Sequence, residues 1–245
     1  MVRQIVQKFF FVCLVYSPVF AVAALPDAIP EVRYMSLGDS LAAGYKAQPA
    51  TKGFVYQLYL KKTFGERPET AFSNSAVPGA KSSDVANFQI PQVALFQPNI
   101  VTISVGGNDL LVLLSQPDPI ASAPVVLGEY AANLGVILTK LCIQMPERGE
   151  IYLNNLYVIP GIPGVDQVVP LFNAVLTDVV ANVKMMDVCA DKTIAIADVY
   201  SAFIGEKGLL LIERYRRRGI DFVEVHPTNK GHRAIERAYL EVIAR

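Results

Sequence analysis

The sequence predicts an α/β protein whose helices cover both faces of a central, mainly parallel sheet of five strands. From residue 33 onward, short β-like runs alternate with longer segments of helical period, which is typical of βαβ units. The chain has 245 residues, of which 52% are hydrophobic and 18% charged, a balance typical of a globular domain. We find no internal repeat and no linker, so we expect a single three-layer α/β/α sandwich.

Five short apolar runs supply the predicted strands. They span residues 33–37, 70–74, 99–105, 150–158 and 193–197. Five segments between and after them are predicted helices, most of them because apolar residues recur every three or four positions. They span residues 53–64, 83–96, 127–145, 167–186 and 229–243. Thr228 stands where an N-cap of the last helix belongs.

Other local patterns predict the connections. Proline and glycine are concentrated in residues 116–124 and 160–164, which predicts loops there. The one basic run, Arg214 with Arg216, Arg217 and Arg218, is typical of the solvated end of a helix.

The first residues have the pattern of a secretory signal peptide. Arg3 and Lys8 precede an apolar run over residues 9–16, and small residues follow at 21–23. Ser17 and Pro18 interrupt the apolar stretch, which is shorter than the ~20 residues of a spanning helix, so an uncleaved anchor is the less favoured alternative. We expect residues 1–23 to be cleaved, residues 24–245 to form the domain, and the protein to be secreted or periplasmic.

The counts of charged residues, histidines and cysteines limit the ligands that the protein could bind and leave the state of its cysteines open. Lysine plus arginine and aspartate plus glutamate both number 22, so there is no excess positive charge for nucleic acid binding. With only two histidines and no cluster of cysteine and histidine at metal-binding spacing, a zinc site is not expected. Cys142 and Cys189 could pair after export or remain reduced and buried, and their spacing does not decide between these alternatives.

Polar residues follow several predicted strands, at the edge of the sheet where parallel α/β proteins place their active sites. Ser40 follows the first strand within Gly-Asp-Ser-Leu, and Asn108 follows the third strand within Gly-Gly-Asn-Asp. Gly79 follows the second strand and could supply a backbone N–H. His226 precedes the last helix and is the natural general base, whereas His232, inside that helix, is expected on the surface or in packing.

These four blocks, in this order, resemble the SGNH hydrolases, also called the GDSL lipase/esterase family. The resemblance extends from Tyr34 to Gly231. It implies a flavodoxin-like SGNH hydrolase fold and an ester hydrolase without metal or cofactor. In such an enzyme Ser40 attacks the ester carbonyl, His226 takes the proton, and an acyl-enzyme forms. The resemblance also assigns the oxyanion hole to the N–H groups of Ser40 and Gly79 and to the side-chain amide of Asn108.

One position departs from the family pattern. An aspartate usually stands three residues before the catalytic histidine, but here that position is Val223. Glu224 is a candidate substitute acid, Asp221 is also near in sequence, and in some relatives a backbone carbonyl accepts from the imidazole instead. The departure keeps a second hypothesis open, a degenerate domain that binds a lipid or glycan without turnover. Asp198 matches a family feature that is usually structural.

The substrate range remains broad at this stage. The expected substrates are small-molecule or lipid esters, including lysophospholipids and short-chain acyl esters, and transient contact with lipid surfaces fits such substrates. An acyltransferase would use the same acyl-enzyme and is the third hypothesis. Residues 110–127 are rich in leucine, valine and proline and could either line an acyl pocket or complete the core. The sequence does not indicate an oligomeric state.

Overall fold

The computed structural model describes residues 32–61, 63–64, 70–206, 208–210, 213–217, 220–224 and 226–243. For residues 213–217 and 220–224 it describes the course of the backbone alone. The predicted signal peptide, residues 1–23, lies outside the described residues.

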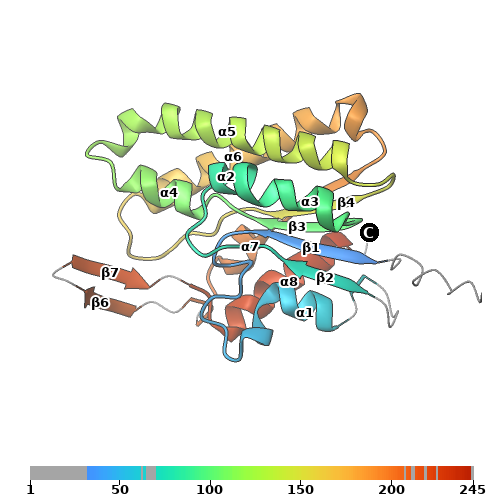
Figure 1. The fold of residues 1–245 in the computed structure, drawn as a ribbon. Helices are drawn as coiled ribbons and strands as arrows, with labels where there is room; N and C mark the ends of the chain where they lie inside the picture. Colours follow the sequence, from blue (N-terminus) through green and yellow to red (C-terminus); the bar gives the residue numbers. More distant parts are fainter. Residues whose placement is uncertain are drawn as a thin grey trace, which may run out of the picture.

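The central sheet contains five parallel strands, as predicted (Figure 1). The strands are β1 (Arg33–Gly38), β2 (Ala71–Asn74), β3 (Ile100–Ser104), β4 (Glu150–Asn154) and β5 (Thr193–Ala197). They lie in the order β2-β1-β3-β4-β5. The chain first adds β2 on one side of β1, and then adds β3, β4 and β5 in succession on the other side. Each predicted strand is found, although β4 ends at Asn154 rather than at residue 158. The carboxyl ends of β1, β3 and β4 therefore lie side by side at one edge.

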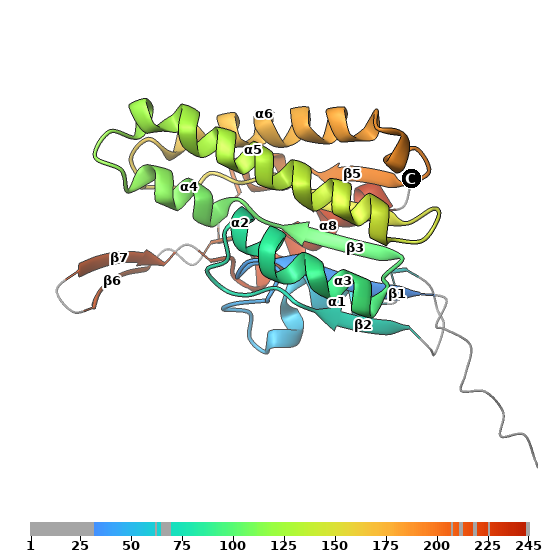
Figure 2. The same ribbon diagram turned by 45° about the horizontal axis from the view of Figure 1, so that its top comes forward.

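Helices cover both faces of this sheet and complete a three-layer α/β/α sandwich (Figures 1 and 2). One layer contains α2 (Ser82–Asp84), the π-helical turn η2 (Val85–Gln89), α3 (Ile90–Phe96), α4 (Gly107–Leu114), α5 (Pro119–Gln144) and α6 (Val165–Lys184). The other layer contains α1 (Phe54–Leu60), α7 (Val199–Phe203) and α8 (Asn229–Ile243). Short 3-10 turns occur at η1 (Ala50–Lys52) and η3 (Asp187–Cys189).

The core lies on both faces of the sheet because the strands are apolar on both sides. β3 is buried along its whole length, as expected of a strand covered by helices on both faces. Phe172 of α6 packs with Tyr130 of α5 in one layer, and Tyr239 of α8 stacks on Phe54 of α1 in the other. Tyr239 also donates a hydrogen bond to the carbonyl of Ile103, so the layer of α1 and α8 is fixed to the central strand.

The predicted loop at residues 116–124 is partly wrong, because α5 already begins at Pro119. Asp118 caps this helix by accepting a hydrogen bond from the N–H of Ala121, and Pro119 occupies the first turn, where proline needs no amide partner. Pro124 lies inside the helix near its start. The cluster of prolines indicated a loop, but Pro119 fits the first turn of a capped helix and Pro124 is accommodated within it.

The basic run was also misassigned. Arg214, Arg216 and Arg217 belong to strand β6 (Glu213–Arg217), which pairs antiparallel with β7 (Ile220–Glu224), and not to a helix. In the sequence, Gly219 stands between two runs that contain Tyr215, Phe222 and other β-forming residues, so hairpin propensity outweighs the charge pattern. The hairpin projects from the same end of the molecule as α4 and the start of α5 (Figure 1).

Two further expectations are resolved by the structure. Cys142 and Cys189 form a disulfide with an S–S distance of 2.11 Å, which joins α5 to η3. Thr228 caps α8 as predicted, because its hydroxyl accepts from the N–H of Gly231.

Candidate active site

A tight turn after β1 brings Ser40 to the carboxyl edge of the sheet. Gly38 has φ +128°, and a Cβ added there would overlap the carbonyl oxygen of Ser104, so only glycine allows β1 and β3 to approach in this way. The N–H of Asp39 then donates to Ser104 O at 3.0 Å. The chain leaves the sheet at this bond, and Ser40 follows in the turn.

Ser40 and His226 are in contact although 186 residues separate them in the sequence. The distance between His226 Nε2 and Ser40 Oγ is 2.8 Å, within hydrogen-bonding range. The segment after His226 is fixed by the N–H of Thr228, which donates to Leu209 O at 2.8 Å. A general base in this position can receive the proton of the serine hydroxyl.

Tyr45 connects the turn of Ser40 to the histidine. Its N–H donates to Ser40 O at 2.9 Å, and its ring lies edge-on to the His226 ring with 4.6 Å between the centroids. His232 Nε2 lies 3.3 Å from Tyr45 O, and the His232 side chain is buried. His232 is therefore the packing residue that the sequence allowed, and its burial lowers its pKa to about 4.

Asn108 lies in the first turn of α4, directly after β3. Its Nδ2 donates to Ala80 O at 2.9 Å, which ties this turn to the segment that follows β2. Gly79 precedes Ala80 and has φ +88°. Ser40, His226 and Asn108 line the same pocket, so the structure brings these three predicted residues together. Gly79 does not line this pocket; it is the neighbour in sequence of Ala80, to which Asn108 bonds.

A cavity of about 90 Å³ opens beside these residues. Its walls come from the turns after β1, β3 and β4 and from the segment that carries the histidine. The lining residues are Asp39, Ser40, Leu41, Gly107, Asn108, Leu110, Leu111, Leu156, Tyr157, Ile159 and His226. Polar groups at one end of an apolar pocket are typical of small-molecule sites.

Two buried carboxyl groups belong to the site and its immediate surroundings, Asp39 in the pocket lining and Asp109 next to Asn108 in the sequence. Asp39 accepts from the N–H of Leu41 at 2.9 Å, and Asp109 accepts from the N–H and the hydroxyl of Ser82 at 2.9 and 2.6 Å. Burial and, to a smaller degree, the charge of Asp109 raise the pKa of Asp39 to about 7. The bond from Leu41 shows that the Asp39 carboxyl stabilises the backbone of its own turn.

Gln89 supports the serine turn and was missed in the sequence. Its side chain is buried and accepts from the N–H of Gly38 at 2.7 Å while donating to Gly38 O at 2.8 Å. Gln89 ends the π-helical turn η2, where the wider backbone spiral rotates side chains relative to an α-helix. No local pattern distinguishes Gln89, because Asn87 and Gln92 of the same helical segment are polar too.

The candidate orienting acids belong to a segment whose side chains the structure does not describe. Asp221, Val223 and Glu224 lie in β7, of which only the backbone is placed. Asp198 has the structural role expected, because its carboxylate caps α7 by accepting from the N–H of Ser201 and also accepts from Asn155.

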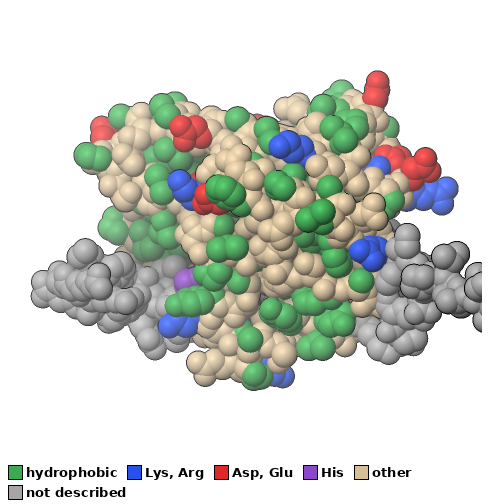
Figure 3. All heavy atoms as spheres, viewed as in Figure 1, with side chains coloured by type: hydrophobic (Ala, Val, Ile, Leu, Met, Phe, Trp, Pro, Cys, Tyr) green, Lys and Arg blue, Asp and Glu red, His purple; other side chains and the backbone are tan. Residues whose placement is uncertain are grey.

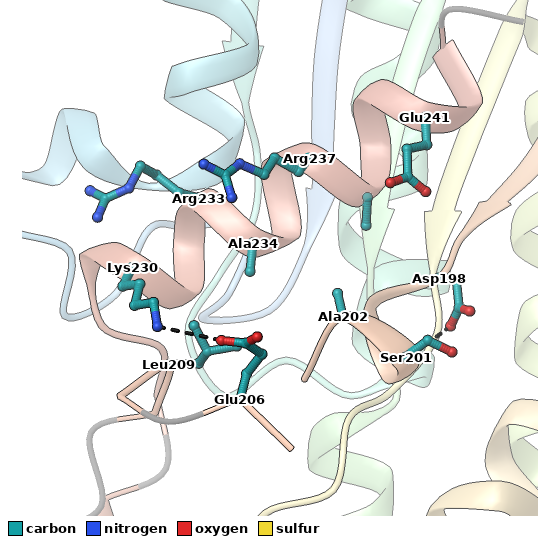
Figure 4. Close-up of a pocket in the computed structure, with 11 residues that line it drawn as sticks. Asp198, Ser201, Ala202, Glu206, Leu209, Lys230, Arg233, Ala234, Arg237 and Glu241 are labelled. Atoms are coloured by element: carbon teal, nitrogen blue, oxygen red, sulfur yellow. Dashed lines mark hydrogen bonds and ion pairs between the residues drawn. The ribbon is translucent and has the colours of Figure 1, made fainter. Parts of the chain in front are cut away.

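A larger cavity, of about 520 Å³, lies elsewhere, between α7 and α8 (Figure 4). Arg233, Arg237 and Glu241 of α8 lie on one side, and Asp198 and Ser201 on the other. It contains neither Ser40 nor His226, and no histidine lines it. In the part of the chain that the structure describes, no group of three acidic, histidine or cysteine residues could hold a metal ion. The smaller pocket is therefore the candidate active site.

Residues 36–234 match the model of the GDSL-like lipase/acylhydrolase family, which covers most of the chain and all four blocks. The chain belongs to this family of ester hydrolases. The GDSL hydrolase fold is also found in solved structures. An acetylxylan esterase from Geobacillus stearothermophilus, Axe2, has 19% identity and a TM-score of 0.65, with coverage of 88% of this chain and 95% of its own. No curated protein matches the chain significantly.

Two metagenomic enzymes have similar structures. The lipase Lip_vut3 from a goat rumen metagenome is 25% identical, with a TM-score of 0.64, over 84% of this chain and 95% of its own. LAE5, described as an alpha/beta hydrolase from the metagenome of Lake Arreo, Spain, is 16% identical, with a TM-score of 0.65, over 89% of this chain and 97% of its own. These likenesses establish the SGNH-type fold and do not identify the ester that this GDSL family member hydrolyses.

Proposed function

We propose that the protein is a secreted carboxylic ester hydrolase that works through an acyl-enzyme on Ser40. The observation that carries the proposal is the 2.8 Å contact between Ser40 Oγ and His226 Nε2, at the mouth of an apolar pocket that Asn108 also lines. A hydroxyl, a base and an amide donor around one small cavity are what acyl transfer to water requires.

In the proposed mechanism, Ser40 Oγ attacks the ester carbonyl while His226 Nε2 takes the hydroxyl proton. The carbonyl oxygen becomes an oxyanion, which accepts hydrogen bonds from the N–H groups of Ser40 and Gly79 and from the amide of Asn108. The carbon–oxygen bond to the alcohol then breaks, and His226 returns the proton to the departing alkoxide. Water, deprotonated by His226, attacks the acyl-enzyme and releases the acid.

The geometry of Asn108 suits this role. Its Nδ2 carries two hydrogens, and the bond to Ala80 O uses one of them. The second hydrogen is left for an oxyanion, while the first bond fixes the orientation of the amide in advance. The same bond holds the backbone around Gly79 beside Asn108, which supports Gly79 as a neighbouring donor.

The partner that orients His226 is the least defined part of the proposal. Val223 stands at the usual position of the acid, so the candidates are the carboxylate of Glu224 and a backbone carbonyl. A Glu224→Gln variant separates them. A carboxylate partner predicts a large loss of kcat, up to about 10⁴-fold as in established triads, and a carbonyl partner predicts little change.

The pocket favours a short acyl group. A volume of about 90 Å³ is far below the ~300 Å³ at which pockets for drug-sized ligands begin. Leu110, Leu156 and Ile159 line it with aliphatic carbon. We propose short-chain acyl esters or the reacting end of a longer lipid ester as substrates. Among the structural neighbours, one is an acetylxylan esterase and one a lipase.

Export to the periplasm or outside the cell is the proposed location. The signal-like pattern of residues 1–23 supports it, and so does the disulfide between Cys142 and Cys189, since such bonds persist in oxidising compartments. Fractionation of the producing cells, with a check for removal of the first residues, tests this location.

Hydrolysis of p-nitrophenyl esters of increasing acyl length tests the activity. Ser40→Ala and His226→Ala should each lower kcat by about 10⁶-fold, and Asn108→Ala by about 10²- to 10³-fold. A serine-reactive phosphonate should label the wild-type protein and not Ser40→Ala. Turnover or labelling that survives Ser40→Ala would refute the assignment of the nucleophile.

The same assay separates the two other hypotheses. Binding of a lipid or glycan without turnover or labelling would identify a degenerate domain. Products richer in transferred ester than in free acid, when an acceptor alcohol is present, would identify an acyltransferase.

A further inference from the structure

Tyr45 contacts the proposed general base directly. Its ring lies edge-on to the ring of His226, with 4.6 Å between the centroids and 63° between the planes. This distance lies within the range of favourable aromatic pairs. Tyr45 is 43% exposed, so burial in the core does not account for an aromatic ring at this position. The contact with His226 is what links the Tyr45 side chain to the site.

The plane of the His226 ring needs to be held in place for the reaction. The side chain is half-buried, and a histidine side chain is visible at the surface beside hydrophobic side chains (Figure 3). Rotation of an imidazole about its bond to Cβ has broad minima, so a hydrogen bond at one ring nitrogen does not fix the plane of the ring. Hydrogen bonds weaken steeply when they are misaligned, so this plane decides how well Nε2 meets Ser40 Oγ. A second ring packed against the imidazole restricts its rotation.

Tyr45 is itself fixed at both of its backbone groups. Its N–H donates to Ser40 O at 2.9 Å, and its carbonyl oxygen lies 3.3 Å from Nε2 of the buried His232. A carbonyl oxygen can only accept, so His232 Nε2 carries the hydrogen of this bond. Lys46 Nζ lies 5.5 Å from the centroid of the Tyr45 ring, within the range of cation–π contacts. Tyr45 therefore has a defined place between the turn that carries Ser40 and helix α8.

The segments that carry Tyr45 and His226 are also joined at a second place. The N–H of Gln48 donates to Asn229 Oδ1 at 2.9 Å, and Asn229 Nδ2 donates to Gln48 O at 2.6 Å. Gln48 lies three residues after Tyr45, and Asn229 lies three residues after His226. These two bonds hold the backbones of the two segments together, so the contact between the rings does not depend on the two side chains alone.

We propose that Tyr45 is a positioning residue that holds the imidazole of His226 in the plane where Nε2 faces Ser40 Oγ. This inference rests on the proposed function, because it assigns a further residue to the reaction of Ser40 and His226. Tyr45 does not line the pocket beside Ser40, so it acts through His226 and not on the acyl group. The role concerns the plane of the ring and is separate from that of the group that accepts a hydrogen bond from the imidazole.

Two substitutions separate the ring of Tyr45 from its hydroxyl in the hydrolysis of p-nitrophenyl acetate. Tyr45→Phe keeps the ring and should retain a kcat close to that of the wild type. Tyr45→Leu removes the ring and should lower kcat about tenfold to hundredfold, as the misplacement of a catalytic group does. Acylation and deacylation both use His226 and should slow together, so KM should change little. The rate at which a phosphonate labels Ser40 should fall by a similar factor.

Tyr59→Leu is the matched control. Tyr59 is half-buried in α1, and its ring stacks on Phe72 with 4.5 Å between the centroids. It does not line the pocket beside Ser40. The same substitution therefore removes an aromatic contact of similar length that does not involve His226, and kcat should stay at the wild-type value.

Nuclear magnetic resonance can follow the His226 ring itself, because the chain contains only two histidines. An aromatic ring displaces the signals of protons that lie close to it, so the ring-proton signals of His226 should differ from those of an unfolded histidine. The displacement should persist in Tyr45→Phe and shrink in Tyr45→Leu. The signals of His232, whose ring stacks on Phe54, should stay in place, and His226→Ala assigns the two sets.

Three results would overturn the proposal. The first is a His226 displacement that Tyr45→Leu leaves unchanged, and the second is an equal loss of kcat in Tyr45→Phe and Tyr45→Leu. The third is a Tyr45→Leu variant with a lower free energy of unfolding but an unchanged kcat per folded molecule, because Tyr45 would then only stabilise the fold.

The positioning role and the proposed function can fail separately in this design. A displaced His226 signal that Tyr45→Leu removes, in a protein that hydrolyses no ester, would support the ring contact and contradict the proposed function. Hydrolysis that depends on Ser40 and proceeds at the wild-type rate in Tyr45→Leu would do the reverse.

Discussion

Asp39, the residue before Ser40, makes the stability of the protein depend on pH. Asp39 is 3% exposed, and the pKa of its carboxyl is raised to about 7, mainly by burial. A raised pKa means that the folded protein holds this proton more tightly than the unfolded chain does. Between about pH 4 and pH 7, Asp39 therefore lowers the free energy of unfolding as the pH rises.

Replacing Asp39 with asparagine should remove this effect. The side-chain oxygen that accepts from Leu41 N–H remains, while the ionisable group is lost. The gap between pKa 3.8 and about 7 corresponds to at most about 4 kcal/mol, so Asp39→Asn should be more stable than the wild type above pH 7. Thermal unfolding from pH 4 to pH 8.5 measures the difference between the two proteins.

The two proteins must be compared, because His232 changes the pH dependence of stability in the opposite direction. Its pKa is lowered to about 4 by burial, so stability rises with pH from about 4 to the ordinary histidine value of 6.5. Since both proteins contain His232, its contribution cancels. A difference in unfolding free energy that stays constant across the range would contradict the buried, raised pKa of Asp39.

At the scale of elements, the π-helical turn η2 supports the turn that carries Ser40. Gln89 bonds to both backbone groups of Gly38, the residue whose conformation allows β1 to approach β3. Gly38 O has a second partner, the N–H of Val77, whereas the Gly38 N–H relies on the side-chain oxygen of Gln89. The turn η2 thus stabilises the turn that carries Ser40 through two hydrogen bonds of the Gln89 side chain.

Gln89→Leu should destabilise the protein by about 1 to 3 kcal/mol, because it takes away the acceptor of the buried Gly38 N–H. It should also slow the reaction of Ser40 with a phosphonate. Gln92→Leu is the control, since Gln92 is exposed and its bonds go to Ser75 and Phe88, away from the serine turn. Equal unfolding free energies for the two variants, measured in urea, would show that Gln89 has no supporting role.

At the scale of the whole molecule, the disulfide cross-links α5 to the turn η3, away from the candidate active site. Cys142 lies near the end of α5 and Cys189 in η3, 47 residues later, so the bond encloses β4 and α6. Both side chains are buried. The cross-link limits the unfolded chain and is expected to stabilise the domain by about 2 to 4 kcal/mol.

The double variant Cys142→Ser and Cys189→Ser should therefore melt about 5 to 15 °C below the wild type. Adding a reductant should lower the melting temperature of the wild type and leave that of the variant unchanged. A wild type that melts at the same temperature with and without reductant, after confirmed reduction of the bond, would refute this contribution.

The sequence by itself determined the class of fold and the five strands, and it named Ser40, Asn108 and His226, which line one pocket. These features depend on local patterns: apolar runs that only a covered sheet can bury, Gly38 at a turn, and polar residues directly after strands. Because parallel strands end at one edge, Ser40 and Asn108 could be expected to lie together from the order of the elements alone.

The tertiary structure decided what depends on partners distant in the sequence. Pairing of Cys142 with Cys189, the bond from Asn108 to Ala80 and the support from Gln89 each need two segments whose separation in space no local pattern encodes. The helix start at Pro119 and the β6–β7 hairpin were mispredicted because prolines and arginines suit more than one local structure. Helix and strand propensities of arginine and most other residues differ by only about 1 kcal/mol or less, and proline costs little in the first turn of a helix, so packing and capping decide between the alternatives.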